Sequence, residues 1–129
     1  MALNELMDGT LHSLPDCLAV CYVDMPEELV LTRRSTRPFS QEVLDAIATL
    51  SARLLNGRGI SGAWRRAALA DIGDLPEEAV ARNHGYTCLF LRMPDHEDHA
   101  LCLVCHPDAD VAQMRQVGRQ LGKDIANVL

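Results

Sequence analysis

The chain has 129 residues, of which 48% are apolar and 23% charged, a balance typical of a soluble globular protein with one core. We therefore expect a single domain over residues 1–129. The formal net charge of −6 argues against a nucleic-acid partner, because phosphate binding depends on an excess of lysine and arginine. Only 4% of the residues are aromatic, so the core is expected to be aliphatic.

The N-terminus and the cysteines indicate a cellular location. The first ten residues include Glu5 and Asp8 and lack the basic start and apolar run of a signal peptide. No apolar stretch is long enough to cross a bilayer. The five cysteines are odd in number and lie in apolar segments, as buried, reduced thiols do. We expect a cytoplasmic protein that does not contact membranes.

In chain order, the first predicted element is a helix that ends at Pro15, with leucines and a methionine at helical spacing. Two strands follow, CLAVCYVD and LVLTRR, joined by a turn at MPEE, which predicts a hairpin from about Cys17 to Arg34. The first of these strands is apolar on both faces. It should therefore be covered on both sides.

The clearest pattern predicts a long helix that begins after Ser40 and ends near Asn56. Ser40 is a favourable N-cap, and Phe39 and Leu44 stand at the two positions of a hydrophobic staple. An apolar stripe on this helix includes Val43, Ile47, Leu50 and Leu54. The glycine- and arginine-containing residues 57–76 fit either a short helix or a long connection.

Three more strands and a last helix complete the prediction. Glu78–Asn83 is a weak strand with charged ends, which is typical of a sheet edge. Two stronger strands, YTCLFLRM and HALCLVCH, flank a turn at PDHED. The last helix should begin near Asp108, whose carboxylate can cap it. Within that helix Gly118 and Gly122 lie one turn apart, which indicates a close backbone contact, because glycine is costly there.

The elements therefore follow the order α-β-β-α-β-β-β-α. Strands that are apolar on both faces need helices on both sides. The predicted fold is α/β, a three-layer sandwich with a five-stranded antiparallel sheet between helices.

Residues 96–108, HEDHALCLVCHPD, concentrate side chains that can bind metals. Zinc needs its donors about 2.0–2.3 Å from one ion. A strand rises about 3.3 Å per residue, so Cys102 and His106 would stand about 13 Å apart. Cys102 and Cys105 would also point to opposite faces. We therefore expect no metal, cofactor or catalytic residues here, and no cysteine lies at a glycine-rich turn that would activate it. Phosphate-loop and nucleophile-elbow motifs do not occur in the chain either.

The basic residues are unevenly distributed. Seven of the twelve fall between positions 33 and 66, and all seven are arginines. The simpler interpretation is a solvated face, and the alternative is a patch that binds an acidic partner. The candidate patch residues are Arg33, Arg34, Arg37, Arg65 and Arg66.

The order of elements resembles that of the roadblock/dynein light chain 7 family. The matching segments are LMDGTLHSLPDCLAVCYVDMPEELVLTRR, EVLDAIATLSARLLN and YTCLFLRMPDHEDHALCLVCHPDADVAQMRQVGRQLGKDIANVL. The chain departs from the family at Asp16 and in MPEE, where family members often have glycine. The connection from Gly57 to Pro76 is also longer than usual.

This resemblance implies a roadblock-like (profilin-like) fold and a homodimer without enzymatic activity. In the family, the long helix and the third strand of two chains pair to give a continuous sheet. Carried over by position, the interface would use the exposed flank of Gln41–Asn56 and the strand Glu78–Asn83. The candidate interface residues are Val43, Ile47, Leu50, Leu54, Ala79, Val80, Ala81 and Arg82.

The resemblance also implies a role. Bacterial relatives regulate small Ras-like GTPases, or act as scaffolds for signalling or motility complexes. Two alternatives come from other classes. One is a small-ligand sensor of the profilin-like or PAS-like type, with residues 57–73 as a lid that carries Trp64, Arg65 and Arg66. The other is a metal- or thiol-dependent enzyme.

Overall fold

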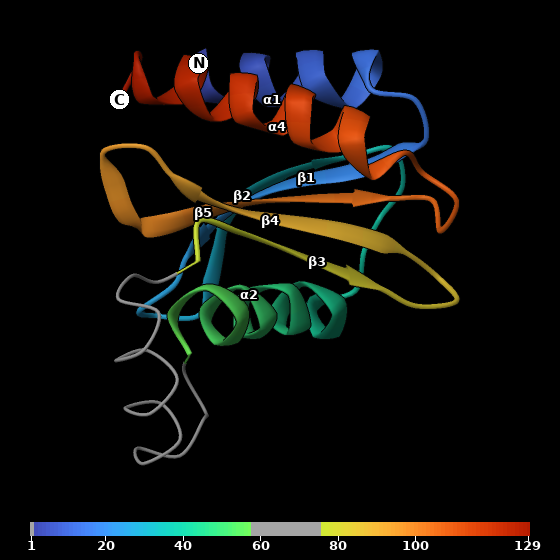
Figure 1. Ribbon diagram of the computed structural model, residues 1–129, viewed down its shortest axis with the longest axis horizontal. Helices are drawn as coiled ribbons and strands as arrows, with labels where there is room; N and C mark the ends of the chain where they lie inside the picture. The colour runs from blue at the N-terminus through green and yellow to red at the C-terminus, as the bar shows by residue number, and fades with distance from the viewer. Residues whose placement is uncertain (1, 58–75) are drawn as a thin grey trace.

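The computed structural model describes residues 2–57 and 76–129 (Figure 1). These ranges contain α1 (Ala2–Ser13), β1 (Cys17–Asp24), β2 (Leu29–Ser35), α2 (Gln41–Asn56), β3 (Glu78–Arg82), β4 (Thr87–Met93), β5 (His96–Cys105) and α4 (Val111–Ala126). The predicted order of helices and strands is confirmed. Residues 57–76 were expected to form either a short helix or a long connection, and residues 58–75 of this segment lie outside the described ranges.

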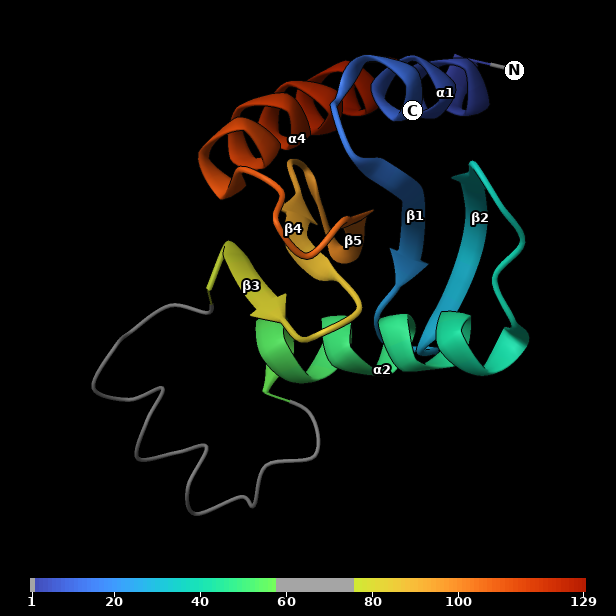
Figure 2. The same ribbon diagram turned by 90° about the vertical axis from the view of Figure 1, so that its right-hand side faces the viewer.

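The five strands form one antiparallel sheet in the order β2-β1-β5-β4-β3. Helices α1 and α4 lie side by side on one face of this sheet, and α2 crosses the other face (Figures 1 and 2). The three-layer sandwich is therefore confirmed. None of the helices in the described ranges has the length and apolar character needed to cross a membrane.

The two central strands supply a core to each layer. In β1, Val20 and Tyr22 pack under α1 and α4, whereas Cys21 and Val23 pack under α2. Strand β5 alternates in the same way, and its last six residues are all buried. Alternation places every second side chain on the opposite face. A strand buried on both sides must therefore be apolar throughout, as the sequence of β1 indicated.

The caps of α2 agree with the sequence, whereas the start of α4 does not. Ser40 Oγ accepts a hydrogen bond from Val43 N at 3.2 Å, and Gly57 ends the helix in the left-handed conformation with φ 67°. The N-cap of α4 is Asp110, whose carboxylate accepts from Ala112 N at 3.0 Å. The prediction of Asp108 was wrong, because a turn closed by Ala109 N donating to His106 O precedes the helix.

The turn between β4 and β5 is also tighter than predicted. It consists of Pro94 and Asp95 alone, and Asp95 takes φ 63°. Met93 pairs with His96 across it. His96 therefore belongs to β5, and the polar residues that follow it extend that strand instead of widening the turn.

Both positions at which the chain lacks an expected glycine adopt left-handed backbone. Asp16 has φ 64° between α1 and β1, and Glu28 has φ 50° in the turn before β2. Glycine reaches this region at no steric cost, whereas other residues do so at a cost. The backbone geometry therefore persists although the residue type has changed.

The helical glycines confirm one of the two expected close contacts. A Cβ at Gly118 would lie 2.6 Å from Leu91 Cδ1 and 3.1 Å from Leu103 Cδ1. At Gly122 the nearest atom would be Pro94 Cδ at 3.4 Å, which is ordinary van der Waals contact. Helix α4 approaches the sheet closely at Gly118 and less closely one turn later.

This difference makes Gly118→Ala and Gly122→Ala a matched pair. Alanine is favoured over glycine in a helix by about 1 kcal/mol, so Gly122→Ala should raise the free energy of unfolding by up to about that amount. Overpacking against Leu91 should outweigh this gain in Gly118→Ala and lower the free energy by about 1 kcal/mol. Urea titration measures both values. Shifts of the same sign and size would contradict the assigned close approach.

Candidate interaction surface

The histidines and cysteines of residues 96–106 are spread over both faces of the sheet. Cys102 packs under α2, whereas Cys105 packs under α1 and α4. His99 Nδ1 lies 2.8 Å from the Tyr22 hydroxyl, and His96 stacks on His99 at 6.1 Å between ring centroids. In the described part of the chain, no group of three or more His, Cys, Asp or Glu side chains could hold a metal ion. The two cysteines are core residues, and His96 and His99 contact each other and Tyr22.

The predicted interface residues of α2 divide between the core and the surface. Ile47 is 5% exposed and packs against the sheet, so its place on an exposed flank was wrong. Val43 is partly buried against the same core. Leu50 and Leu54, one turn apart, are 38% and 37% exposed. The helix has a wide apolar stripe of which only this margin reaches the surface.

Strand β3 forms one edge of the sheet, as predicted. Ala79 and Ala81 pack partly against the core under α2, whereas Val80 pairs with Leu89 and is 38% exposed on the other face. Arg82 is engaged within its own chain, where it donates to Thr87 Oγ1 at 2.8 Å and to Ala109 O at 3.1 Å. Of the four β3 candidates, Val80 is the one exposed apolar side chain.

An ion-pair cluster ties β3 to α4. The Glu78 carboxylate accepts hydrogen bonds from Arg119 at 2.9 Å and 3.1 Å, and Arg115 Nε lies 2.9 Å from its Oε1. Bidentate arginine–carboxylate pairs fix both partners in orientation. The spacing of Arg115 and Arg119 four residues apart was a usable sequence signal, because such residues share one side of a helix. Their partner Glu78 could be found only from the fold.

Arg92 of β4 holds together three segments near the same edge. Its guanidinium donates to Leu55 O at 2.7 Å and Asn56 Oδ1 at 2.7 Å, at the end of α2. It also donates to Pro76 O at 3.2 Å and Glu97 O at 2.9 Å. The carbonyls at the end of a helix need donors from elsewhere. Arg92 supplies a donor to one of them, Leu55 O, and joins α2 to the residues that lead into β3.

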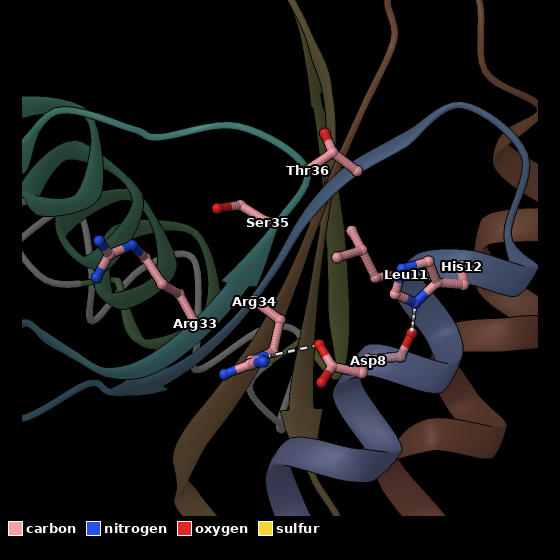
Figure 3. Close-up of a pocket in the computed structure, with 7 residues that line it drawn as sticks. All are labelled: Asp8, Leu11, His12, Arg33, Arg34, Ser35 and Thr36. Carbon is pink, nitrogen blue, oxygen red and sulfur yellow. Dashed lines mark hydrogen bonds and ion pairs between the residues drawn. The ribbon is translucent and has the colours of Figure 1, made fainter.

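The candidate arginine patch does not form one continuous surface in the described residues. Arg34 points toward α1 and binds Asp8 at 2.7 Å, whereas Arg33 points to the opposite side of β2 (Figure 3). The guanidinium of Arg37 lies over the rings of Phe39 and Tyr86, at 5.8 Å and 5.9 Å from their centroids. Arg65 and Arg66 lie outside the described residues.

A shallow groove runs between α1 and β2, beside the Asp8–Arg34 pair (Figure 3). The Arg34 hydrogen bond holds the pKa of Asp8 below its usual value. His12 Nδ1 lies 2.7 Å from the Asp8 carbonyl oxygen. Asp8 pairs with Arg34 in this groove and Arg33 also lines it, so the groove offers a partner one arginine more than its aspartate balances.

A small apolar hollow lies between α4 and the β4–β5 hairpin. Its volume is about 200 Å³, and it is lined by Leu91, Leu101, Pro94 and the two glycines of α4 among others. Pockets that hold small ligands usually measure about 300–1,000 Å³. The sensor alternative therefore gains no support from this hollow, and its proposed lid lies outside the described residues.

Replacing Arg92 should test the link between α2 and the β3 edge. Arg92→Ala leaves two helix-end acceptors without their donor, so the free energy of unfolding should fall by about 2 kcal/mol. Arg33→Ala, at an exposed position on β2, should leave it nearly unchanged. Chemical denaturation measures both. Equal effects of the two substitutions would show that the Arg92 contacts do not stabilise the fold.

No protein-family model and no curated protein matches the sequence. Solved structures, however, are similar over nearly the whole chain. The Roadblock/LC7 domain from Streptomyces avermitilis superposes with a TM-score of 0.74 at 17% identity and covers 99% of this chain and 98% of its own. The gliding protein MglB from Thermus thermophilus gives a TM-score of 0.73 at 20% identity, with coverages of 98% and 87%.

A third similar structure is MglC from Myxococcus xanthus. Its TM-score is 0.67 at 11% identity, and the match covers 100% of both chains. Identities this low establish architecture, since one fold supports many functions. The resemblance seen in the sequence is confirmed at this level: the chain has the roadblock/LC7 fold.

Proposed function

We propose that the chain, as one domain over residues 1–129, is a homodimeric regulatory or scaffold protein of the cytoplasm without enzymatic activity. Its partner would be a small Ras-like GTPase or a signalling or motility complex. The observation that carries this proposal is the open edge of β3 beside α2, the helix that carries the exposed Leu50 and Leu54. An edge strand with apolar neighbours is a ready template for pairing with another chain.

The edge suits a second copy of the same chain. In the described part of the molecule, β3 pairs with β4 and has no strand on its other side. A twofold axis through this edge would join two β3 strands antiparallel and bring two α2 helices together. Such an isologous contact uses the same patch on both subunits.

The exposed leucines of α2 support the same arrangement. Leu50 and Leu54 lie one turn apart at the margin of the apolar stripe of this helix. A twofold axis that passes beside them would let each leucine meet its counterpart, and burial of their exposed area would stabilise association.

A non-enzymatic role is supported by the use of the polar side chains. Glu78, Arg82 and Arg92 connect secondary-structure elements by hydrogen bonds, so their charged groups are engaged within the chain. The similar structures support a regulatory or motility partner, since they include MglC and the gliding protein MglB. MglB has also been solved in a tetrameric arrangement, which supports self-association.

The leucines of α2 provide a direct test of the dimer. The double variant Leu50→Asp, Leu54→Asp should weaken self-association at least about 100-fold, because charges would be buried at the interface. Analytical ultracentrifugation at micromolar protein should show a dimer for the original chain and a monomer for this variant.

A matched control lies on the opposite edge of the sheet. Leu29 and Leu31 of β2 are 49% and 48% exposed, so they offer similar apolar surface. The double variant Leu29→Asp, Leu31→Asp should remain dimeric. Dissociation of this variant, or a monomeric original chain at about 100 μM, would contradict the proposed interface.

The partner is tested separately. The immobilised chain is exposed to small Ras-like GTPases of the same cell, loaded with GDP or with a non-hydrolysable GTP analogue. One nucleotide state should bind at least about 10-fold more tightly, because the switch segments of such proteins differ between the states. If no GTPase binds while the chain remains dimeric, the proposed GTPase partner is wrong and only the scaffold role remains.

A further inference from the structure

Cys17 and Cys105 occupy directly opposed positions at one end of the sheet. Cys17 is the first residue of β1 and Cys105 the last of β5, and the two are register partners. One residue further toward the end of the sheet, Asp16 lies opposite His106, and His106 N donates a hydrogen bond to Asp16 O at 2.9 Å. Hydrogen-bonded and non-hydrogen-bonded pairs alternate along an antiparallel ladder, so Cys17 and Cys105 form a non-hydrogen-bonded pair.

This type of pair suits a disulfide. Its Cα atoms typically lie about 4.5 Å apart, inside the range of about 4.4–6.8 Å that a disulfide requires. Both side chains lie on the same face of the sheet, in the core under α1 and α4. The Cys17 thiol donates to Ala19 O at 3.6 Å, and its interaction with the Cys105 thiol lowers the pKa of Cys17 and raises that of Cys105. The two sulfurs therefore lie on one face of the sheet, on opposed residues of neighbouring strands, just beyond a register shift of β1 between Cys17 and Ala19.

The remaining cysteines lack this combination. Cys21 and Cys102 are also register partners, but both are 0% exposed beneath α2, and burial raises the pKa of Cys21 to about 12. Cys88 pairs with Val104, two residues along β5 from Cys102, although its thiol also interacts with that of Cys102, which lowers the pKa of Cys88. Such diagonal positions lie about 7–8 Å apart between Cα atoms, beyond the usual reach of a disulfide.

We propose that Cys17 and Cys105 are a redox modification site, a dithiol that a hydroperoxide converts to a disulfide across the ends of β1 and β5. Cys17 is the point of entry, because it is 6% exposed and follows the exposed Asp16, whereas Cys105 is 0% exposed. Hydrogen peroxide is small enough to reach such a thiol. The bridge fastens the strand that follows α1 to the strand that leads into α4.

The reaction balances with hydrogen peroxide as the oxidant. The Cys17 thiolate attacks one peroxide oxygen, the O–O bond breaks, and the leaving hydroxide takes up a proton to give water and a Cys17 sulfenic acid. The Cys105 sulfur then attacks the Cys17 sulfur, the S–O bond breaks, and the hydroxide leaves as water with the proton of Cys105. The two sulfurs lose two electrons, which reduce one peroxide to two waters.

The reduced full-length chain is treated with hydrogen peroxide, its remaining thiols are alkylated, and the product is digested without reductant. Chymotryptic cleavage after Leu18, Tyr22 and Leu103 places Cys17, Cys21, Cys102 and Cys105 on separate peptides. We expect a mass loss of about 2 Da before alkylation, three free thiols of the original five, and one linked peptide pair with Cys17 and Cys105.

Two serine variants test whether the geometry of the cysteine pair or the exposure of a thiol decides which cysteines are oxidised. Cys88 is the most exposed of the five cysteines, so exposure alone would make it react first. Cys88→Ser should retain the linkage, and Cys17→Ser should abolish it while the other thiols stay reduced. The bridge should raise the Tm of the original chain by about 5 °C or more, because it closes a long loop in the unfolded state.

Three results would overturn the proposal. These are a linkage between any other two cysteines, five free thiols after peroxide treatment, and oxidation of Cys17 to sulfinic acid without a bridge. The mapped peptides of the original chain decide between them even if a serine variant does not fold. An unchanged Tm in the linked protein would overturn the claim that the bridge fastens the two strands.

Discussion

The double-sided burial of β1 and β5 is the constraint on which the rest of this structure depends. Strand β1 and the last six residues of β5 carry apolar side chains on both faces, so one layer of helices cannot cover them. Helices α1 and α4 bury one face and α2 the other (Figure 2). Because α2 alone covers its side of a five-stranded sheet, its margin at Leu50 and Leu54 is left exposed. The proposed contact surface is thus a consequence of how the core is closed.

Arginines fix the free edge that this arrangement creates. Arg92 connects the end of α2 to the residues before β3, and Glu78 at the start of β3 is held by Arg115 and Arg119 of α4. Arg82 anchors the other end of the strand to the segment before α4. A strand of five residues has few hydrogen bonds of its own, so these charged contacts set its position. An edge held in this way has a defined shape for a partner to recognise.

The cysteines of β1 and β5 lie in the two cores on opposite faces of the sheet and differ in chemistry. Cys21 and Cys102 lie under α2, where burial disfavours the thiolate, and they act as small apolar side chains. Cys17 and Cys105 stand at the end of the sheet, where the ladder places them opposite each other. Their position relative to the solvent and to each other, more than their residue type, decides which thiols can react.

The sequence by itself determined the order of elements, the two-faced burial of β1, the caps of α2, the edge character of β3 and the layer arrangement, because these follow from local periodicity and capping chemistry. Only the tertiary structure decided that Asp110 caps α4, that Ile47 is buried while Leu50 and Leu54 are not, and that Glu78, Arg92 and Cys17 have the partners they have. The reason is physical. A helical stripe shows which side is apolar but not how far the opposing sheet extends. Ion pairs and cross-strand partners join residues far apart in the chain, and their meeting depends on register, which no local pattern contains.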